Sequence, residues 1–168
     1  PLVTEEAMTI ITNGDPMWCP TGVTPGGAGC TAAFNYFNGA GGLLAVIANK
    51  TVAGTIWIAD SYTGNIGTTA GVDGEVNAVT LDGSLGTTTN FALTIKGGWN
   101  GILGSTIITG TSEFNVPLII TNWNADITIS NITIQGTGGT NALQVFTSKN
   151  IVLTNVQSNN NAGRGALL

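Results

Sequence analysis

The chain has 168 residues, a formal net charge of −5 and no histidine, and only 8% of its residues are charged, against about 25% in typical soluble domains. Its four basic residues are scattered, which argues against nucleic-acid binding, because that function needs clustered Lys and Arg. They are Lys50, Lys96, Lys149 and Arg164. The length fits one domain with its own core, and no apolar run approaches the ~20 residues that a membrane-spanning helix needs.

The first fifty residues predict a cap in front of the main fold. Met8, Ile10 and Ile11 indicate a short strand, and the Asn-Gly-Asp-Pro sequence of residues 13–16 is a strong turn signal. A short helix is predicted within residues 41–50, with Leu43, Val46 and Ile47 on its buried face. We interpret residues 1–50 as an N-terminal cap, since an open first strand edge has to be covered.

The two cysteines of this region bracket a stretch rich in glycine and proline. A disulfide between Cys19 and Cys30 would close that loop and would indicate an oxidising compartment. Two free thiols are the alternative. A metal site is disfavoured, because the chain has no histidine and no further cysteine to complete a ligand set.

Downstream of the cap, apolar residues alternate with Thr, Ser, Asn and Gln, which predicts half-buried β-strands. The predicted strands are 55–60, 78–83, 91–97, 105–110, 116–120, 126–136 and 150–160. The spacing is irregular between Gly67 and Asn115, so the boundaries of any repeat stay open in that part.

The last third of the chain nearly repeats itself. Residues 126–136 match residues 150–160 at an offset of 24, which aligns Ile127 with Ile151 and Asn131 with Asn155. The pairs Leu-Ile at 118, Ala-Leu at 142 and Ala-Leu at 166 follow the same step. A fixed period of this size is typical of solenoids, in which stacked strands ~4.8 Å apart share one core. We therefore predict an all-β chain with a parallel β-helix over residues 51–168 and coils of 24 residues.

Two stretches carry motifs of a known family. Residues 56–66 read Ile-Trp-Ile-Ala-Asp-Ser-Tyr-Thr-Gly-Asn-Ile and resemble the opening of pectin-lyase-like right-handed β-helices. Residues 97–101, 109–112, 131–134 and 155–156 are similar to segments of long bacterial surface β-helix proteins. The resemblance covers roughly residues 50–168. It implies a right-handed helix and an adhesive or filament-forming role, although this scaffold carries unrelated activities.

Enzymes of this family imply two catalytic patterns, and the chain carries neither. Its lyases hold Ca²⁺ with clustered Asp and use Arg or Lys as the base, while its hydrolases pair Asp carboxylates. The acidic residues of the repeat region form no paired-Asp motif. They are Asp60, Asp73, Glu75, Asp82, Glu113 and Asp126. We predict no catalytic residue and no cofactor. A weak Ca²⁺ site at Asp73, Glu75 and Asp82 is an alternative to a solvated acidic loop.

Two periodic side-chain types invite a binding hypothesis. Trp99 and Trp123 lie one period apart, so we expect them to stack at one corner of adjacent coils. Exposed indoles would bind a polysaccharide, whereas buried ones would only pack over the edge. Asn131 and Asn155 share another corner and predict an internal amide ladder that satisfies turn backbone groups.

In the repeat alignment, residues 166–168 begin a new strand and no polar terminal repeat follows. Leu167 and Leu168 are then expected at an open end, covered either by a longer chain or by a second copy stacked head to tail. The N-terminal segment, with Leu2, Val3, Met8 and Ile10, is a candidate covering strand.

The sequence therefore favours a non-catalytic, secreted or cell-surface structural or adhesive protein that assembles end to end with itself into a filament, or forms part of a longer fibre. A carbohydrate-binding module is the first alternative, and a polysaccharide-lyase-like enzyme is the second.

Overall fold

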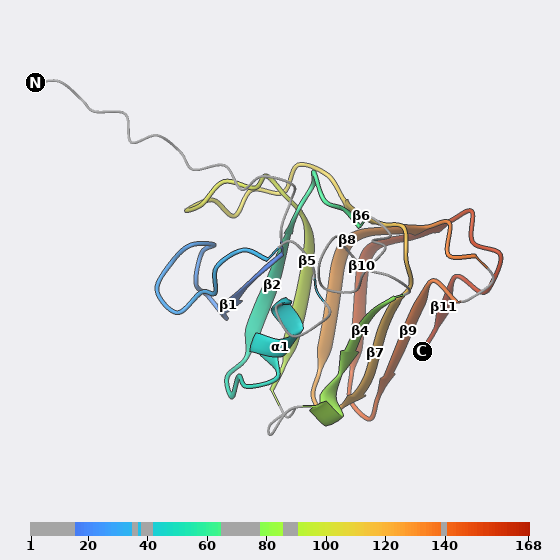
Figure 1. The fold of residues 1–168 in the computed structure, drawn as a ribbon, viewed down its shortest axis with the longest axis horizontal. Helices are drawn as coiled ribbons and strands as arrows, with labels where there is room; N and C mark the ends of the chain where they lie inside the picture. The colour runs from blue at the N-terminus through green and yellow to red at the C-terminus, as the bar shows by residue number, and fades with distance from the viewer. Residues whose placement is uncertain (1–15, 35–36, 38–41, 65–77, 86–90, 139–140) are drawn as a thin grey trace, which may run out of the picture.

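The computed structural model describes residues 16–34, 37, 42–64, 78–85, 91–138 and 141–168. Its strands form two sheets that face each other across a shared apolar core (Figure 1). The larger sheet contains β1 (Met17–Pro20), β2 (Gly54–Ala59), β3 (Thr63–Gly64), β5 (Leu93–Trp99), β6 (Ser112–Phe114), β8 (Ile127–Gln135) and β10 (Ile151–Asn159). The smaller sheet contains β4 (Val79–Asp82), β7 (Leu118–Trp123), β9 (Leu143–Thr147) and β11 (Ala166–Leu167).

The core lies between the two sheets and follows directly from the alternation of the sequence. In β8, Ile127, Ile129, Ile132 and Ile134 are fully buried, while the residues between them are half-buried. The inward residues of the smaller sheet belong to the same apolar cluster. They include Val79, Leu81, Leu118, Ile120, Leu143 and Val145. Alternating side chains point to opposite faces of a strand, so one row from each sheet meets in the middle.

The predicted parallel β-helix with uniform 24-residue coils is wrong. The structure has two separate sheets, and the larger one mixes parallel and antiparallel strands, because β1 runs antiparallel to β2. In that sheet Gly54 pairs with Leu93, Leu93 with Ile127, and Ile127 with Ile151, in steps of 39, 34 and 24 residues. In the larger sheet the 24-residue period thus holds only for the pair β8 and β10. Longer connections separate the earlier strands, and a strand pattern says nothing about connection length.

The smaller sheet departs from the period as well. Val79 pairs with Leu118, Leu118 with Leu143 and Leu143 with Ala166, in steps of 39, 25 and 23 residues. The sequence alignment had matched Leu143 with Leu167, one residue away. Because a shift of one residue turns every side chain to the other face of a sheet, Leu167 lies opposite Gln144 rather than opposite Leu143.

The helix predicted within residues 41–50 is confirmed as α1 (Leu43–Ile47). Leu43 and Ile47 are buried in the main core, and Val46 is half-buried. The remaining element is a short 3₁₀ turn, Gly83–Leu85, after β4. The boundary of a cap at residue 50 stays a prediction, since β1 belongs to the same sheet as β2.

A close approach of backbones shapes the end of β5. Gly98 has a φ of +71°, and a Cβ atom there would lie 2.0 Å from the Gly110 carbonyl oxygen. Only glycine fits such a position. The Gly98 N–H donates to the hydroxyl of Ser112, which is fully buried and lies 2.7 Å from the Ala59 carbonyl oxygen. This hydroxyl ties β2, β5 and β6 together.

Candidate interaction edge

β10 forms one outer edge of the larger sheet. It pairs in parallel with β8 from Ile151 opposite Ile127 to Asn159 opposite Gln135. Among the described residues no strand pairs with its other side. A nine-residue strand with one unpaired side presents a row of backbone N–H and C=O groups that another strand can use.

The side chains of β10 show that this edge is incompletely covered. Ile151, Leu153 and Val156 pack against the main core but stay half-buried, whereas their register partners in β8 are fully buried. On the opposite face, Val152 is 50% exposed. β10 carries no charged residue, no proline and no glycine, which are devices that usually protect edge strands.

A hollow of about 270 Å³ opens beside this strand, between the two sheets. Its apolar lining includes Ile134 of β8, Leu143 of β9, Leu153 and Val156 of β10, and Ala166 of β11. The last strand of each sheet therefore borders the same gap in the core.

The bend in β10 is marked by an asparagine with a side-chain hydrogen bond. Asn155 Nδ2 donates to Asn131 Oδ1 at 2.9 Å, so the two amides stack as predicted, but the bond is exposed rather than internal and it joins the two side chains rather than turn backbone groups. Both residues adopt left-handed backbone angles, with φ of 51° and 55°. Asparagine tolerates this conformation better than most residues. Within the described part of the chain, nothing donates to Asn155 Oδ1.

The opposite edge of the same sheet is closed. The Thr31 N–H donates to the Trp18 carbonyl at 2.8 Å, and the Phe34 N–H donates to the Pro16 carbonyl at 2.9 Å. The Trp18 N–H in turn donates to Thr31 Oγ1 at 3.0 Å. Residues 31–34 therefore occupy the outer side of β1, which leaves no open ladder there.

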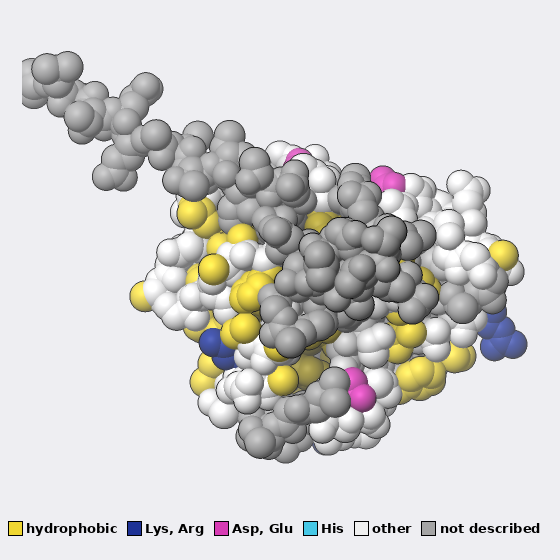
Figure 2. Space-filling model, viewed as in Figure 1, with side chains coloured by type: hydrophobic (Ala, Val, Ile, Leu, Met, Phe, Trp, Pro, Cys, Tyr) yellow, Lys and Arg dark blue, Asp and Glu magenta, His cyan; other side chains and the backbone are white. Residues whose placement is uncertain are grey.

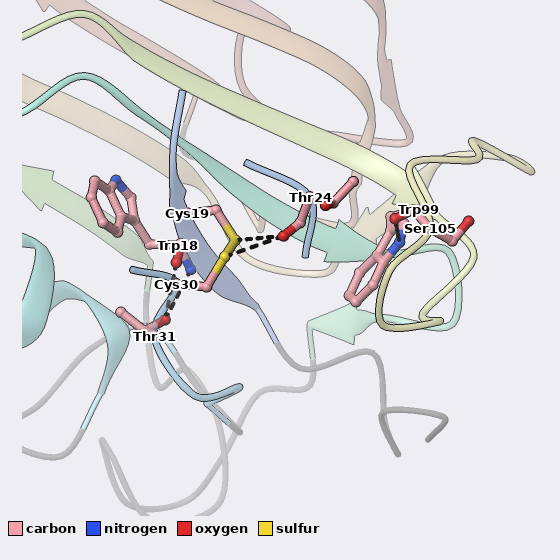
Figure 3. Close-up of a disulfide and its surroundings, with 7 residues drawn as sticks. All are labelled: Trp18, Cys19, Thr24, Cys30, Thr31, Trp99 and Ser105. Carbon is pink, nitrogen blue, oxygen red and sulfur yellow. Dashed lines mark hydrogen bonds between the residues drawn. A yellow bond between two sulfur atoms is a disulfide. The ribbon is translucent and has the colours of Figure 1, made fainter. Parts of the chain in front are cut away.

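The disulfide predicted between Cys19 and Cys30 is confirmed, and it holds this returning segment in place (Figure 3). The Thr24 carbonyl oxygen lies 3.4 Å from the Cys30 Sγ atom. This is a packing contact rather than a hydrogen bond, because a disulfide sulfur carries no hydrogen. Cys19 is fully buried, in a second apolar cluster with Met17, Trp57 and Trp99.

The two tryptophans expected to share a corner lie in different places. Trp99 is fully buried in the second cluster, and its Nε1 donates to the Ser105 carbonyl (Figure 3). Trp123 is 4% exposed in the main core, stacks edge-on against Phe91 at 5.2 Å and donates from Nε1 to the Phe91 carbonyl. The shared corner is therefore a wrong prediction. Neither indole is exposed enough for sugar stacking, because Trp99 is fully buried and Trp123 is only 4% exposed.

The acidic residues of the described chain are dispersed. Asp73 and Glu75 of the predicted Ca²⁺ site lie outside the described residues. Asp82 accepts hydrogen bonds from Asn122 Nδ2 at 2.9 Å and from the Ser84 N–H at 2.9 Å. Those bonds, that of Asn122 first, lower the pKa of Asp82. No group of three or more His, Cys, Asp or Glu in the described ranges has a geometry that suits a metal ion.

The predicted end residues lie beside a second, shallower hollow. Leu168 is 62% exposed and, with Trp123, Val145 and Phe146, lines an open depression of about 450 Å³ next to β9. Figure 2 shows apolar side chains at the surface in this region and few charged ones. The other predicted assembly contacts, Leu2, Val3, Met8 and Ile10, lie outside the described residues.

Comparison of the chain with protein-family models, with curated proteins and with solved structures finds no match. The resemblance to pectin-lyase-like proteins therefore stays a prediction from short motifs. Among the described helices none has the length and apolar character needed to span a membrane. The sequence predicts the open end at Leu167 and Leu168, and it predicts a strand at residues 150–160 without identifying it as an open edge. The available signal was the match of this strand to β8, whose apolar row is buried, while among the described residues no strand pairs with its outer side.

Proposed function

We propose that the protein is a non-catalytic structural or adhesive β protein of the cell exterior, which associates end to end through the unpaired edge of β10. The observation that carries this proposal is the half-buried row Ile151, Leu153 and Val156 on a strand that is bonded on one side only. Burying this row against a further strand removes apolar surface from water and extends an existing hydrogen-bond ladder.

The composition of β10 supports a peptide partner over a charged or sugar ligand. Its nine residues are uncharged, and its outward positions carry Val152, Thr154 and Asn155. Such a surface has no ionic group for recognition of a polyanion, but it has every group that strand addition uses. The side chain of Asn155 adds one polar acceptor at the bend.

The disulfide supports the extracellular assignment, because disulfides persist chiefly in oxidising compartments. A non-catalytic role is supported by the dispersed acidic groups. Asp60 bonds to the Thr109 hydroxyl and Glu113 to the Gln135 amide, so each has a neutral partner. Neither faces a second carboxylate across a cleft in the described structure.

The covered edge of β1 gives the proposed assembly a direction. Since residues 31–34 occupy β1, a second copy cannot place β1 directly against β10. End-to-end association then requires a further strand between the two copies. A contact of this unequal kind builds an open chain of subunits unless the rotation between copies closes a ring.

Analytical ultracentrifugation and electron microscopy of the full chain test the proposal. The wild type is expected to form concentration-dependent elongated assemblies. Val152→Lys places a charge on the exposed face of β10, and we expect it to raise the concentration needed for assembly at least tenfold. Lysine on an edge strand opposes pairing and leaves the core untouched.

Val52→Lys is the matched control. Val52 is 51% exposed, close to the 50% of Val152, and lies before β2, away from β10. This variant is expected to assemble like the wild type. A wild type that sediments as a monomer at the highest attainable concentration overturns the proposal, as does equal inhibition by both substitutions.

A further inference from the structure

Three described strands share a short motif made of an aliphatic residue, a Ser or Thr, and an Asn. It occurs in β7 as residues 120–122, in β8 as residues 129–131 and in β10 as residues 153–155. In all three the asparagine is left-handed, with φ of 55°, 55° and 51°. The motif thus marks one local structure, in which a strand with a parallel neighbour bends at its asparagine.

The sequence contains this motif a fourth time, at Ile11-Thr12-Asn13. With Ile10 it reads Ile-Ile-Thr-Asn, the same four residues as 119–122 of β7. Residues 1–15 lie outside the described part, so the comparison is one of sequence. In β7 and β8 the aliphatic residue of the motif, Ile120 or Ile129, is fully buried and faces the core. Ile11 holds the equivalent position.

We infer that residues 9–13 of a neighbouring copy are the strand that covers β10, in parallel and with Asn13 opposite Asn155. The inference rests on the proposed end-to-end assembly and names its occupant. In this register Ile11 lies opposite Leu153 and covers the middle residue of the half-buried row. The Asn13 amide then donates to the Asn155 Oδ1 atom, as Asn155 donates to Asn131.

Charge agrees with this register. Continuing the alignment towards the N-terminus places Glu6 beside Ser148 and next to the exposed Lys149, which precedes β10. Opposite charges on neighbouring strands favour the pairing by a modest amount.

The covering segment has to come from a second copy. Figure 1 places β1 and β10 at opposite edges of the sheet, with β2, β5 and β8 between them. Four strand spacings amount to about 19 Å. Asn13 precedes Pro16, at the start of β1, by three residues, which span at most ~11 Å. Asn13 therefore cannot reach Asn155 of its own chain.

Cross-linking between two cysteine variants tests the register. Full-length Asn13→Cys is mixed with full-length Asn155→Cys under mild oxidation, and covalent dimers are separated on a non-reducing gel. Residues opposite each other on adjacent strands lie at a Cα separation that a disulfide bridges. We expect a covalent dimer from this mixture. The matched control replaces Asn155→Cys by Asn122→Cys, which alters an exposed asparagine of the same motif on the inner strand β7, and we expect no dimer above background.

A second pair of variants separates this inference from the proposed function. Ile11→Asp is compared with Ile107→Asp, since both isoleucines lie in a Thr-Ile-Ile-Thr sequence and Ile107 is 61% exposed away from β10. Ile11→Asp is expected to raise the assembly concentration at least tenfold, and Ile107→Asp is expected to leave it unchanged. If the wild type assembles but the two variants behave alike and no specific cross-link forms, the occupant is wrong while the proposed function stands. A wild type that stays monomeric overturns both.

Discussion

Two edge strands of the larger sheet, β1 and β10, differ in how their backbone groups are satisfied. At β1 the chain returns along the strand and bonds to it, and a disulfide fixes the return. At β10 a longer and more polar strand has only β8 beside it. The comparison shows what closes an edge in this protein, which is a neighbouring segment that takes up the outer hydrogen-bonding groups. Protection at β1 comes from a covalently fastened neighbour, and β10 has none among the described residues.

The largest expected effect is on the free energy of unfolding. It is tested by truncating two aliphatic side chains to alanine, one on the inner strand β8 and the other at the position opposite it on the outer strand β10. Ile129 is fully buried in β8, and Leu153 lies opposite it in β10. Ile129→Ala should lower the free energy of unfolding by about 4 kcal/mol, because it leaves a cavity in the core. Leu153→Ala should cost about 1 kcal/mol in the monomer, since this side chain already meets solvent.

Urea denaturation, carried out at a protein concentration too low for assembly, measures both losses in the free energy of unfolding. Repeating it above the assembly concentration sharpens the comparison, since a covered Leu153 should then approach the behaviour of Ile129. Equal costs in the monomer would contradict the view that β10 is open.

Loss of the disulfide is the next largest effect. It would free the segment that covers β1, so the two edges β1 and β10 would become more alike. The double variant Cys19→Ser and Cys30→Ser removes a cross-link over a sequence separation of 11 residues. We expect a loss of about 3 kcal/mol in the free energy of unfolding, because the unfolded chain gains conformational freedom. Chemical denaturation of the oxidised wild type and the variant gives the difference. Hydrogen exchange at the Thr31 and Phe34 amides should also rise, whereas slow exchange at both would show that the segment stays on β1 unaided.

The smallest effect concerns the outer strand of the smaller sheet, β4, which is tied to β7 by Asp82 and Asn122. The folded pKa of Asp82 lies below its usual value. A carboxyl group of this kind stabilises the fold above its unfolded pKa, near 4, and loses that contribution as pH falls through the folded pKa. Urea midpoints measured between about pH 2 and pH 6 should therefore fall less steeply towards acid in Asp82→Asn than in the wild type. Asn122→Ala keeps the carboxylate and its bond from the Ser84 N–H but removes the Asn122 donor, so its profile should lie between those of the wild type and Asp82→Asn.

Local patterns predicted the local structure of the chain well. Alternation identified the strands around Ile56, Leu93 and Ile127, and helical spacing identified α1. The disulfide followed from two cysteines around a loop. Each of these features depends on residues close in sequence, or on a pairing with only one possible partner.

Longer-range features could not be predicted in the same way. The antiparallel direction of β1 is set by its contact with β2, about 37 residues later, and no period reports it. Trp99 and Trp123 are one period apart in sequence, yet they belong to different sheets, because the step from β5 to its partner β8 is 34 residues rather than 24. The one-residue shift at Ala166 shows that even neighbouring strands need not keep a constant step.

The unequal edges have a consequence for any mixture of intact and altered copies. A copy whose β10 is blocked but whose N-terminal segment is intact would still join a growing assembly. It would then present no free strand edge to which the next copy could bind. Small amounts of Val152→Lys added to wild type should therefore shorten the assemblies far out of proportion to the amount added. A copy with a blocked N-terminal segment would show the opposite defect. Its β10 could still bind the next copy, but it could not itself bind to the β10 of another copy.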